Sequence, residues 1–220
     1  MRLQISNKRH SAMTLLEVVV VILFVGFVLI AMLLPALQSA KRKAQRITCV
    51  SNLKLDFSGY KIWEGDHNDQ FPMAVLTNQD GGFIYTNNDE MFRYFQVASN
   101  QLEEIRCLIC PADVRHWAND WSSLRNTNIS YFLCVDATEA YPGMVIFGDR
   151  NVVGGTRLPN GLTVFNLTNS VHWGSDMHNG SGNIGLTDGS VAQTTSAGLA
   201  QALIQATNGV TSGVVRYAFP

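Results

Sequence analysis

The chain contains one long apolar run, close to its N-terminus. Residues 18–37 carry no polar or charged side chain. About twenty residues in a helix extend roughly 30 Å, the thickness of the hydrocarbon core of a bilayer. The run therefore predicts a membrane-spanning helix over about residues 15–37.

The helical pattern continues beyond the apolar run. Apolar residues recur there every three or four positions and mark one face of a helix: Ile47, Val50, Leu53, Phe57 and Tyr60. Pro35 should kink the helix, because proline removes a backbone donor and clashes with the preceding turn. The polar segment 66–69 and Pro72 should end it. We expect one helix over about residues 14–66, whose second half packs on a globular domain.

From residue 71 onward, short apolar segments alternate with clusters of Gly, Asn and Asp. This pattern predicts short strands, at 82–85, 105–109, 130–135, 144–147, 162–165, 183–187 and 214–219. Helical segments are expected at 89–97 and 197–206. The expected fold class is α+β, with an antiparallel β-sheet against the long helix. The chain is expected to divide into a short N-terminal segment, residues 1–12, the long helix, 13–66, and a globular domain, 67–220.

One acid, Glu17, stands at the start of the apolar run. A carboxylate that enters hydrocarbon is costly, so it is a functional candidate that needs a partner. The partner we expect is the N-terminal amine of a neighbouring copy, created by cleavage between Ala12 and Met13. An ordinary single-pass anchor is the alternative, but it explains neither Glu17 nor the basic residues that precede the run, Arg2, Lys8 and Arg9.

The segment from Ala12 to Glu17 resembles the class III, prepilin-type processing motif. The resemblance implies that residues 1–12 are a leader removed by a membrane-embedded prepilin peptidase. It also implies methylation of the new amine of Met13 and retention of the apolar segment. Two positions depart from the family's usual residues. Ala12 stands where the family usually has Gly before the cut, and Met13 stands where it usually has Phe after the cut.

The resemblance extends along most of the chain. It is carried by segments 32–54, 62–72, 110–113, 128–132 and 148–151, and by His178 followed after nine residues by Asp188-Gly189, an H-X9-DG element. These segments are similar to the type II secretion, major-pseudopilin-type proteins of the Planctomycetes–Verrucomicrobia group. The acidic calcium loop of well-understood major pseudopilins has no obvious match.

This resemblance implies a pilin-like fold and a non-enzymatic subunit that polymerises into a periplasmic pseudopilus for protein secretion. The chain would be stored in the inner membrane, with its N-terminus cytoplasmic and its C-terminal domain periplasmic. The implied partners are further copies, other pseudopilins, the prepilin peptidase, the secretion platform and membrane lipid.

The distribution of charge argues against a nucleic-acid partner. The chain has a net charge of −1, and loss of the three leader cations would leave −4. Beyond Asp66 there are seven Arg and no Lys against thirteen acids, whereas nucleic-acid binders carry a basic stripe. The one basic cluster, Lys41, Arg42, Lys43 and Arg46, is expected to meet lipid headgroups or acidic faces of neighbouring subunits.

Three residues of one segment, His172, Asp176 and His178, form the best metal-like group, but their spacing is loose. No HExxH, GxSxG or phosphate-loop motif is present, so we expect no enzyme, cofactor or metal. We expect His178, Asp188 and Gly189 to be structural, with Asp-Gly in a type I′ hairpin turn. Two rivals remain: an anchored adhesive or ligand-binding module, with tryptophans 63, 117, 121 and 173 as a sugar platform, and an anchored hydrolase.

Four cysteines are expected to form structural disulfides if the domain is exported. Cys107 and Cys110 are three positions apart, so on a strand they would point to opposite faces and have different partners. We favour Cys49 with Cys110, which would join the helix to the sheet, and Cys107 with Cys134. Free buried thiols are the alternative, and a zinc site is poorly supported by a lone CxxC.

Overall fold

The computed structural model describes residues 14–83, 90–165, 170–208, 210 and 212–220. The chain divides into two compact units, residues 1–41 and residues 42–220. Helix α1, Leu15–Gly65, runs through the boundary between them and contains Pro35. This division falls inside the helix, because the second half of α1 belongs to the core of the larger unit.

In the first unit, α1 is apolar and almost wholly exposed. Its window of highest hydropathy is long and apolar enough to cross a membrane and has no buried residue. Thr14 precedes the helix, and its Oγ1 accepts a hydrogen bond of 3.3 Å from the backbone N–H of Glu17. A Thr in this position satisfies one of the free N–H groups of the first turn.

In the second unit, one face of α1 is buried: Cys49, Leu53, Asp56, Phe57, Gly59, Tyr60, Trp63 and Glu64. Three of the five residues predicted for this face are on it, Leu53, Phe57 and Tyr60. Ile47 is 64% exposed, so the buried face begins at Cys49, two residues later than the pattern predicts.

The main sheet has seven antiparallel strands in the order β4-β5-β9-β1-β2-β7-β8. Their bounds are β1 Tyr131–Cys134, β2 Val145–Asp149, β4 Thr156–Arg157, β5 Thr163–Val164, β7 Ser181–Leu186, β8 Val191–Thr195 and β9 Arg216–Ala218. Strands β3, Val152–Val153, and β6, His172–Trp173, form a separate pair.

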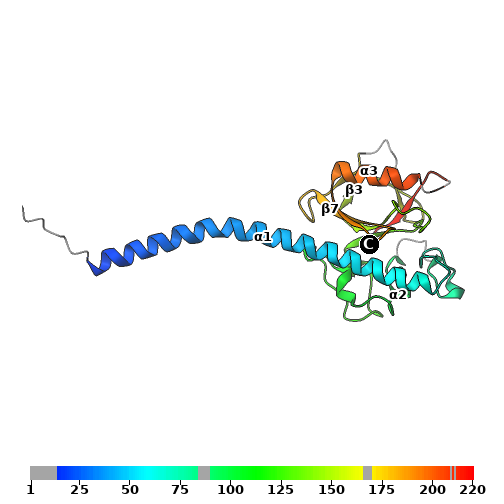
Figure 1. Cartoon of the computed structure of the whole chain (residues 1–220), viewed down its shortest axis with the longest axis horizontal. Helices are drawn as coiled ribbons and strands as arrows, with labels where there is room; N and C mark the ends of the chain where they lie inside the picture. The colour runs from blue at the N-terminus through cyan, green and yellow to red at the C-terminus, as the bar shows by residue number, and fades with distance from the viewer. Residues whose placement is uncertain (1–13, 84–89, 166–169, 209, 211) are drawn as a thin grey trace, which may run out of the picture. The chain divides into compact units, whose positions relative to one another are not determined.

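Short helices complete the unit: α2 Phe92–Val97, α3 Ser196–Thr207, and the 3₁₀ turns η1 Thr77–Gln79, η4 Ile105–Leu108 and η5 Asn126–Asn128. The sheet lies between the cyan part of α1 and helix α3 (Figure 1). Central strands β1 and β2 are buried at every residue. The α+β class and the antiparallel sheet are therefore confirmed.

Most predicted elements match an observed one. Strands predicted at 130–135, 144–147, 162–165, 183–187 and 214–219 contain or overlap β1, β2, β5, β7 and β9, and the two short helices contain or overlap α2 and α3. The strand predicted at 105–109 is wrong, since this segment forms η4. Residues 82–83 are not in a strand, and 84–85 lie outside the described residues.

An aromatic cluster joins α1 to the sheet. The ring of Tyr60 on α1 meets the ring of Phe147 on β2 edge-on, with centroids 4.9 Å apart. Phe95 of α2 lies 5.9 Å from Tyr60 and 6.1 Å from Phe147. All three side chains are buried, so this cluster is the centre of the core.

We expect Phe147→Ala to lower the free energy of unfolding by about 3–5 kcal/mol, since it leaves a cavity in this cluster. Ile62→Ala, on the exposed side of α1, should change it by less than about 0.5 kcal/mol. All four tryptophans lie in residues 42–220. Thermal melts of the full chain in detergent, followed by tryptophan fluorescence, therefore measure this unit. Equal melting temperatures for the two variants would contradict the prediction.

Candidate functional site

The H-X9-DG element spans strand β7, and its two ends lie against different parts of α1. Strand β7 pairs with β8 from Ser181↔Thr195 to Gly185↔Val191, so the expected hairpin is present. Asp188 and Gly189 lie in the turn that joins the two strands, and His178 precedes β7. The element is therefore a hairpin with a histidine at the end opposite its turn.

The turn is not of type I′. Leu186 O accepts from Gly189 N at 3.0 Å, and Leu186 N donates to Ser190 O at 2.9 Å. Gly189 has a φ of 84°, whereas Asp188 is not among the residues with positive φ. The two strands are therefore joined by a three-residue loop that ends in a left-handed glycine. The Asp188 carboxylate accepts a hydrogen bond from the Ser190 N–H at 2.8 Å and so holds the loop.

Gly189 lies directly against α1. A Cβ atom at this position would be 2.8 Å from Cε1 of Phe57, closer than two carbon atoms can pack. The turn is also held by Thr187, whose N–H donates to Met144 O at 2.9 Å. A glycine is required here both by its left-handed backbone and by this contact.

His178 lies at the other end of β7, in a strained loop. His178, Asn179 and Gly180 have φ values of 48°, 50° and 73°, and such runs of left-handed residues persist only where the surrounding structure holds them. The His178 side chain is 3% exposed. Its Nε2 is 3.3 Å from Cys110 Sγ and 3.3 Å from Asn183 Nδ2.

Cys110 is joined to Cys49 of α1 by a disulfide. The bond closes a loop with a sequence separation of 61 residues, which stabilises the fold by roughly 4 kcal/mol in the chain-entropy model. The expected pair of Cys107 with Cys134 is not formed, since both are free and buried. We call Arg46, Cys49, Cys110, Asp149, His178 and Asn183 the helix–hairpin junction.

Asp149, at the end of β2, is the acid of the junction. Its Oδ2 accepts from Asn183 N at 2.7 Å and Asn183 Nδ2 at 2.9 Å, and it lies 3.5 Å from His178 Nε2. Burial raises the pKa of Asp149 to about 7, against the opposing effects of Asn183 and the Arg46 charge. Arg46 on α1 donates to Gly182 O at 3.2 Å and to Asn183 Oδ1 at 3.4 Å.

Burial, and next the charge of Arg46, lower the pKa of His178 to about 4. The imidazole is therefore neutral at physiological pH, and its Nε2 can accept from the Asn183 amide. Each residue of the junction thus contacts another member of it, which favours a structural role over a catalytic one.

The neighbouring segment 148–151 supplies contacts of the same kind. Arg150 donates to both Asp113 oxygens at 2.7 Å and forms an ion pair with this acid. Burial opposes ionisation of Asp113, but hydrogen bonds from Arg150 and Ser130 prevail and lower its pKa. The Asn151 amide donates to carbonyls of Gly174, Met177 and Ser181. This segment therefore fixes the loop that carries His178.

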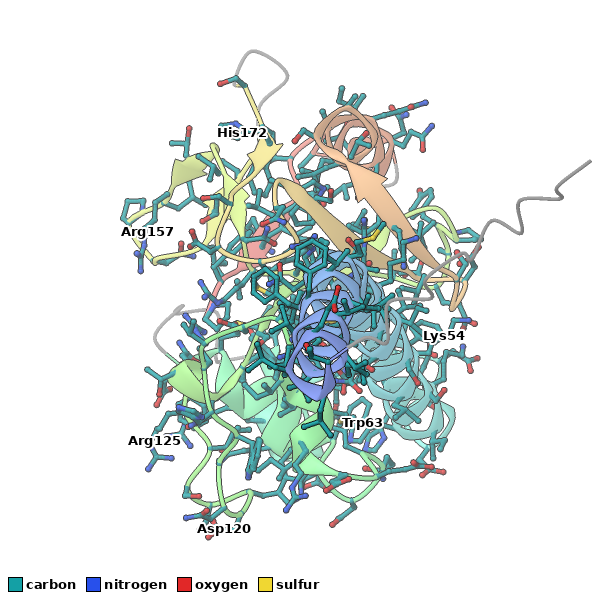
Figure 2. All side chains as sticks on the ribbon, turned by 90° about the vertical axis from the view of Figure 1, so that its left-hand side faces the viewer. Lys54, Trp63, Asp120, Arg125, Arg157 and His172 are labelled. Carbon is teal, nitrogen blue, oxygen red and sulfur yellow. A yellow bond between two sulfur atoms is a disulfide. The ribbon has the colours of Figure 1, made fainter. Side chains whose placement is uncertain are left out.

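The metal-like group suggested by the sequence is not assembled. His172 is exposed on β6, at the periphery of the molecule (Figure 2), and its ring contacts Ser170 O. Among the described residues, the atoms close enough to share a metal are those of Cys49, Cys110 and His178, all within 4.8 Å of one another. Both of these sulfurs are in the disulfide, so they are not available as thiolate ligands.

The tryptophans do not form one exposed platform. Trp63 and Trp173 are buried, Trp117 is exposed and stacks under Arg106, and Trp121 packs partly buried against the core. Glu17 is exposed near the start of α1. Ala12 and Met13, the expected cleavage site, lie outside the described residues.

Two buried acids of α1, Asp56 and Glu64, were not anticipated from the sequence. Asp56 lies on the inner face of α1 and is fully buried, and Cys107 Sγ donates to its Oδ1 at 3.0 Å. Burial raises the pKa of Asp56 to about 7, which the hydrogen bond from Cys107 partly opposes. The burial of Asp56 could have been predicted from its position between Leu53 and Phe57 on the apolar face of the helix.

Comparison with known proteins gives no match: no family model matches the chain, and no curated protein or solved structure is significantly similar to it. What the chain does must therefore be inferred from its own residues and geometry.

The raised pKa of Asp56 predicts that the fold loses stability as pH rises. The folded state holds a proton that an unfolded Asp releases near its ordinary pKa of 3.8, so the stability that Asp56 contributes is fully present below pH 4 and is lost as pH rises through about 7. A shift of this size corresponds to roughly 4 kcal/mol. Asp56→Asn keeps an acceptor for Cys107 and should flatten the decline. What remains is the decline due to Asp149 and an opposite change due to His178, whose lowered pKa favours the folded state as pH rises.

Urea unfolding of the full chain at pH 4.5, 6 and 8 measures this effect. Asp66→Asn, an exposed acid at the end of the same helix, is the control and should keep the wild-type decline. A decline that is the same in Asp56→Asn and wild type would contradict the assignment.

Gly189→Val should destabilise the fold by about 1–3 kcal/mol, through backbone strain and the contact with Phe57. Gly143→Val is the matched control, because nothing lies within 4 Å of a Cβ there and its φ is not positive. The melting temperatures of the two variants are compared with that of wild type. A comparable fall in melting temperature in both variants would refute the role given to Gly189.

Proposed function

We propose that the chain is a non-enzymatic, membrane-anchored subunit of a pilin-like fibre, of the type II secretion pseudopilus kind. The observation that carries the proposal is the division of α1. Its first half is apolar and exposed, and its second half is a core element of the globular unit.

The exposed half needs an apolar environment outside the folded chain. Large hydrophobic side chains are exposed at nearly every position from 15 to 37. Soluble monomers rarely expose a continuous apolar surface of this extent to water. Lipid can cover them in the stored subunit, and helices of neighbouring copies can cover them in a fibre. An apolar helix on a soluble domain suits both states.

Glu17 supplies polarity where the apolar run begins. Its carboxylate is exposed in the single chain, so a partner outside the chain can reach it. The N-terminal amine created by cleavage before Met13 is a suitable partner in a neighbouring copy. Two unit charges 4 Å apart attract by roughly 4 kcal/mol at an effective dielectric constant near 20. This pair would set the axial position of each incoming subunit.

The helix–hairpin junction supports the same function. The disulfide of Cys49 and the hydrogen bonds of Arg46 attach α1 to two separate segments of the globular unit. A force applied to this part of the helix is therefore passed to the sheet through covalent and polar contacts. The expected compartment is oxidising, where such a disulfide persists.

Glu17→Ala should leave the protein in the membrane and abolish fibres, because the unpaired amine of the neighbouring copy would enter lipid or an apolar helix bundle without a counter-charge. Glu103→Ala, at an exposed acid of the globular unit, is the control and should form wild-type fibres. Fibres are counted by electron microscopy after overexpression.

Intact mass of the membrane-extracted protein separates processing from assembly. The mature wild-type chain should begin at a methylated Met13, and Glu17→Ala should still be cleaved. A chain that begins at Met1, or abundant fibres from Glu17→Ala, would overturn the proposal.

A further inference from the structure

A basic pocket opens at the start of the globular unit, beside the helix–hairpin junction. It has a volume of about 370 Å³ and is lined by Arg42, Lys43 and Arg46 of α1 and by the loop that carries Ser175, Asp176 and Asn179. This volume is sufficient for a phosphate group with a small polar substituent, and it lies entirely within residues 42–220.

The pocket carries an excess of positive charge. Three cations face one acid, Asp176. The pKa of Arg150 is raised chiefly by its hydrogen bond to Asp113, and the charge of Asp176 adds to this effect. His178, at the base of the pocket, is neutral because burial and Arg46 lower its pKa. The lining is therefore positive overall and favours an anion.

The pocket is also organised in advance. Arg46 is held by its hydrogen bonds to Gly182 O and Asn183 Oδ1. The loop opposite is fixed by the Asn151 amide, which donates to carbonyls of Gly174 and Met177. Fixed walls lower the entropy cost of binding a small ligand. The Ser175 hydroxyl and the Asn179 amide add neutral donors and acceptors at the rim.

The chain places this pocket near the surface of a bilayer. Arg42 follows the last residue of the apolar run, Leu37, by five positions. Five residues extend at most about 18 Å, and about 7.5 Å in a helix. The polar headgroup layer on each side of a bilayer is roughly 5–8 Å thick. With residues 18–37 in the hydrocarbon, the pocket is within reach of lipid phosphates.

We propose that this pocket binds the phosphate diester of an anionic phospholipid, with Arg42, Lys43 and Arg46 around the phosphate and Ser175 and Asn179 toward a hydroxylated headgroup. Such a lipid would hold the globular unit against the membrane. The site does not depend on fibre formation and would serve a plain membrane anchor equally well.

Native mass spectrometry of the full chain tests the proposal. The protein is released from nanodiscs that contain equal amounts of phosphatidylglycerol and phosphatidylcholine, and the lipids it retains are counted. Wild type should retain phosphatidylglycerol roughly tenfold over phosphatidylcholine. Lys43→Glu should remove this preference, since it reverses an exposed charge at the pocket.

Lys54→Glu is the matched control. It makes the same change of charge on the exposed side of α1 (Figure 2), eleven positions further along. Lys54 is not one of the residues that line the pocket. Its lipid preference should equal that of wild type. Tryptophan melts of both variants establish that the globular unit is still folded.

A second arm distinguishes lipid from soluble phosphate. Inorganic phosphate is titrated onto wild type and Lys43→Glu in nanodiscs of phosphatidylcholine alone, at constant ionic strength. Saturable phosphate binding without any preference for phosphatidylglycerol would assign the pocket to a soluble phosphate and overturn the lipid assignment. Equal retention of the two lipids by wild type would overturn the proposal that the pocket is the binding site. An equal loss of the preference for phosphatidylglycerol in Lys43→Glu and Lys54→Glu would do the same.

Discussion

Burial of one face of α1, from Cys49 to Glu64, is the contact on which the globular unit depends. The sheet alone presents an apolar surface, with β1 and β2 buried at every position, and α1 supplies the side chains that cover it. Tyr60 is central, because its ring contacts both Phe95 and Phe147. The same helix continues into an apolar segment that the chain leaves uncovered. One element therefore requires two environments, and the change from one to the other falls within a few turns.

The β7–β8 hairpin fixes where on α1 that change occurs. Its turn rests on Phe57 through Gly189, and its opposite end brings His178 to the disulfide of Cys49. The length of β7 sets the distance between these two contacts, so the nine-residue spacing has a structural cause. Buried acids accompany the contact, since Asp56 and Asp149 both lie at this interface with raised pKa values. Such groups contribute little stability, but a shifted register of the helix would leave them without their partners.

Strong periodicity made α1, α3 and the central strands predictable, and weak or non-local signals account for the failures. Segment 105–109 is apolar enough for a strand, but it forms a 3₁₀ turn that directs Cys107 toward Asp56 and carries Cys110 to Cys49. Cys134 lies on β1 opposite Tyr217, and a pairing between distant cysteines cannot be deduced from spacing alone. Strands of two residues, such as β4, leave no periodic pattern. The groups that surround His178 come from four separate segments, those of Arg46, Cys110, Asp149 and Asn183, so only the fold reveals them.

The arrangement of reactive groups bears on what the protein can do. His178 is neutral and buried, the nearby sulfurs are bonded to each other, and Asp149 accepts two hydrogen bonds from Asn183. Groups so engaged hold a structure together, and none of them combines a free nucleophile with a base that a substrate could approach. The charged residues that flank the apolar segment are exposed, Glu17 before it and Arg42 and Lys43 after it. Both positions are open to the surroundings of the apolar segment, as the assembly and anchoring that we propose require.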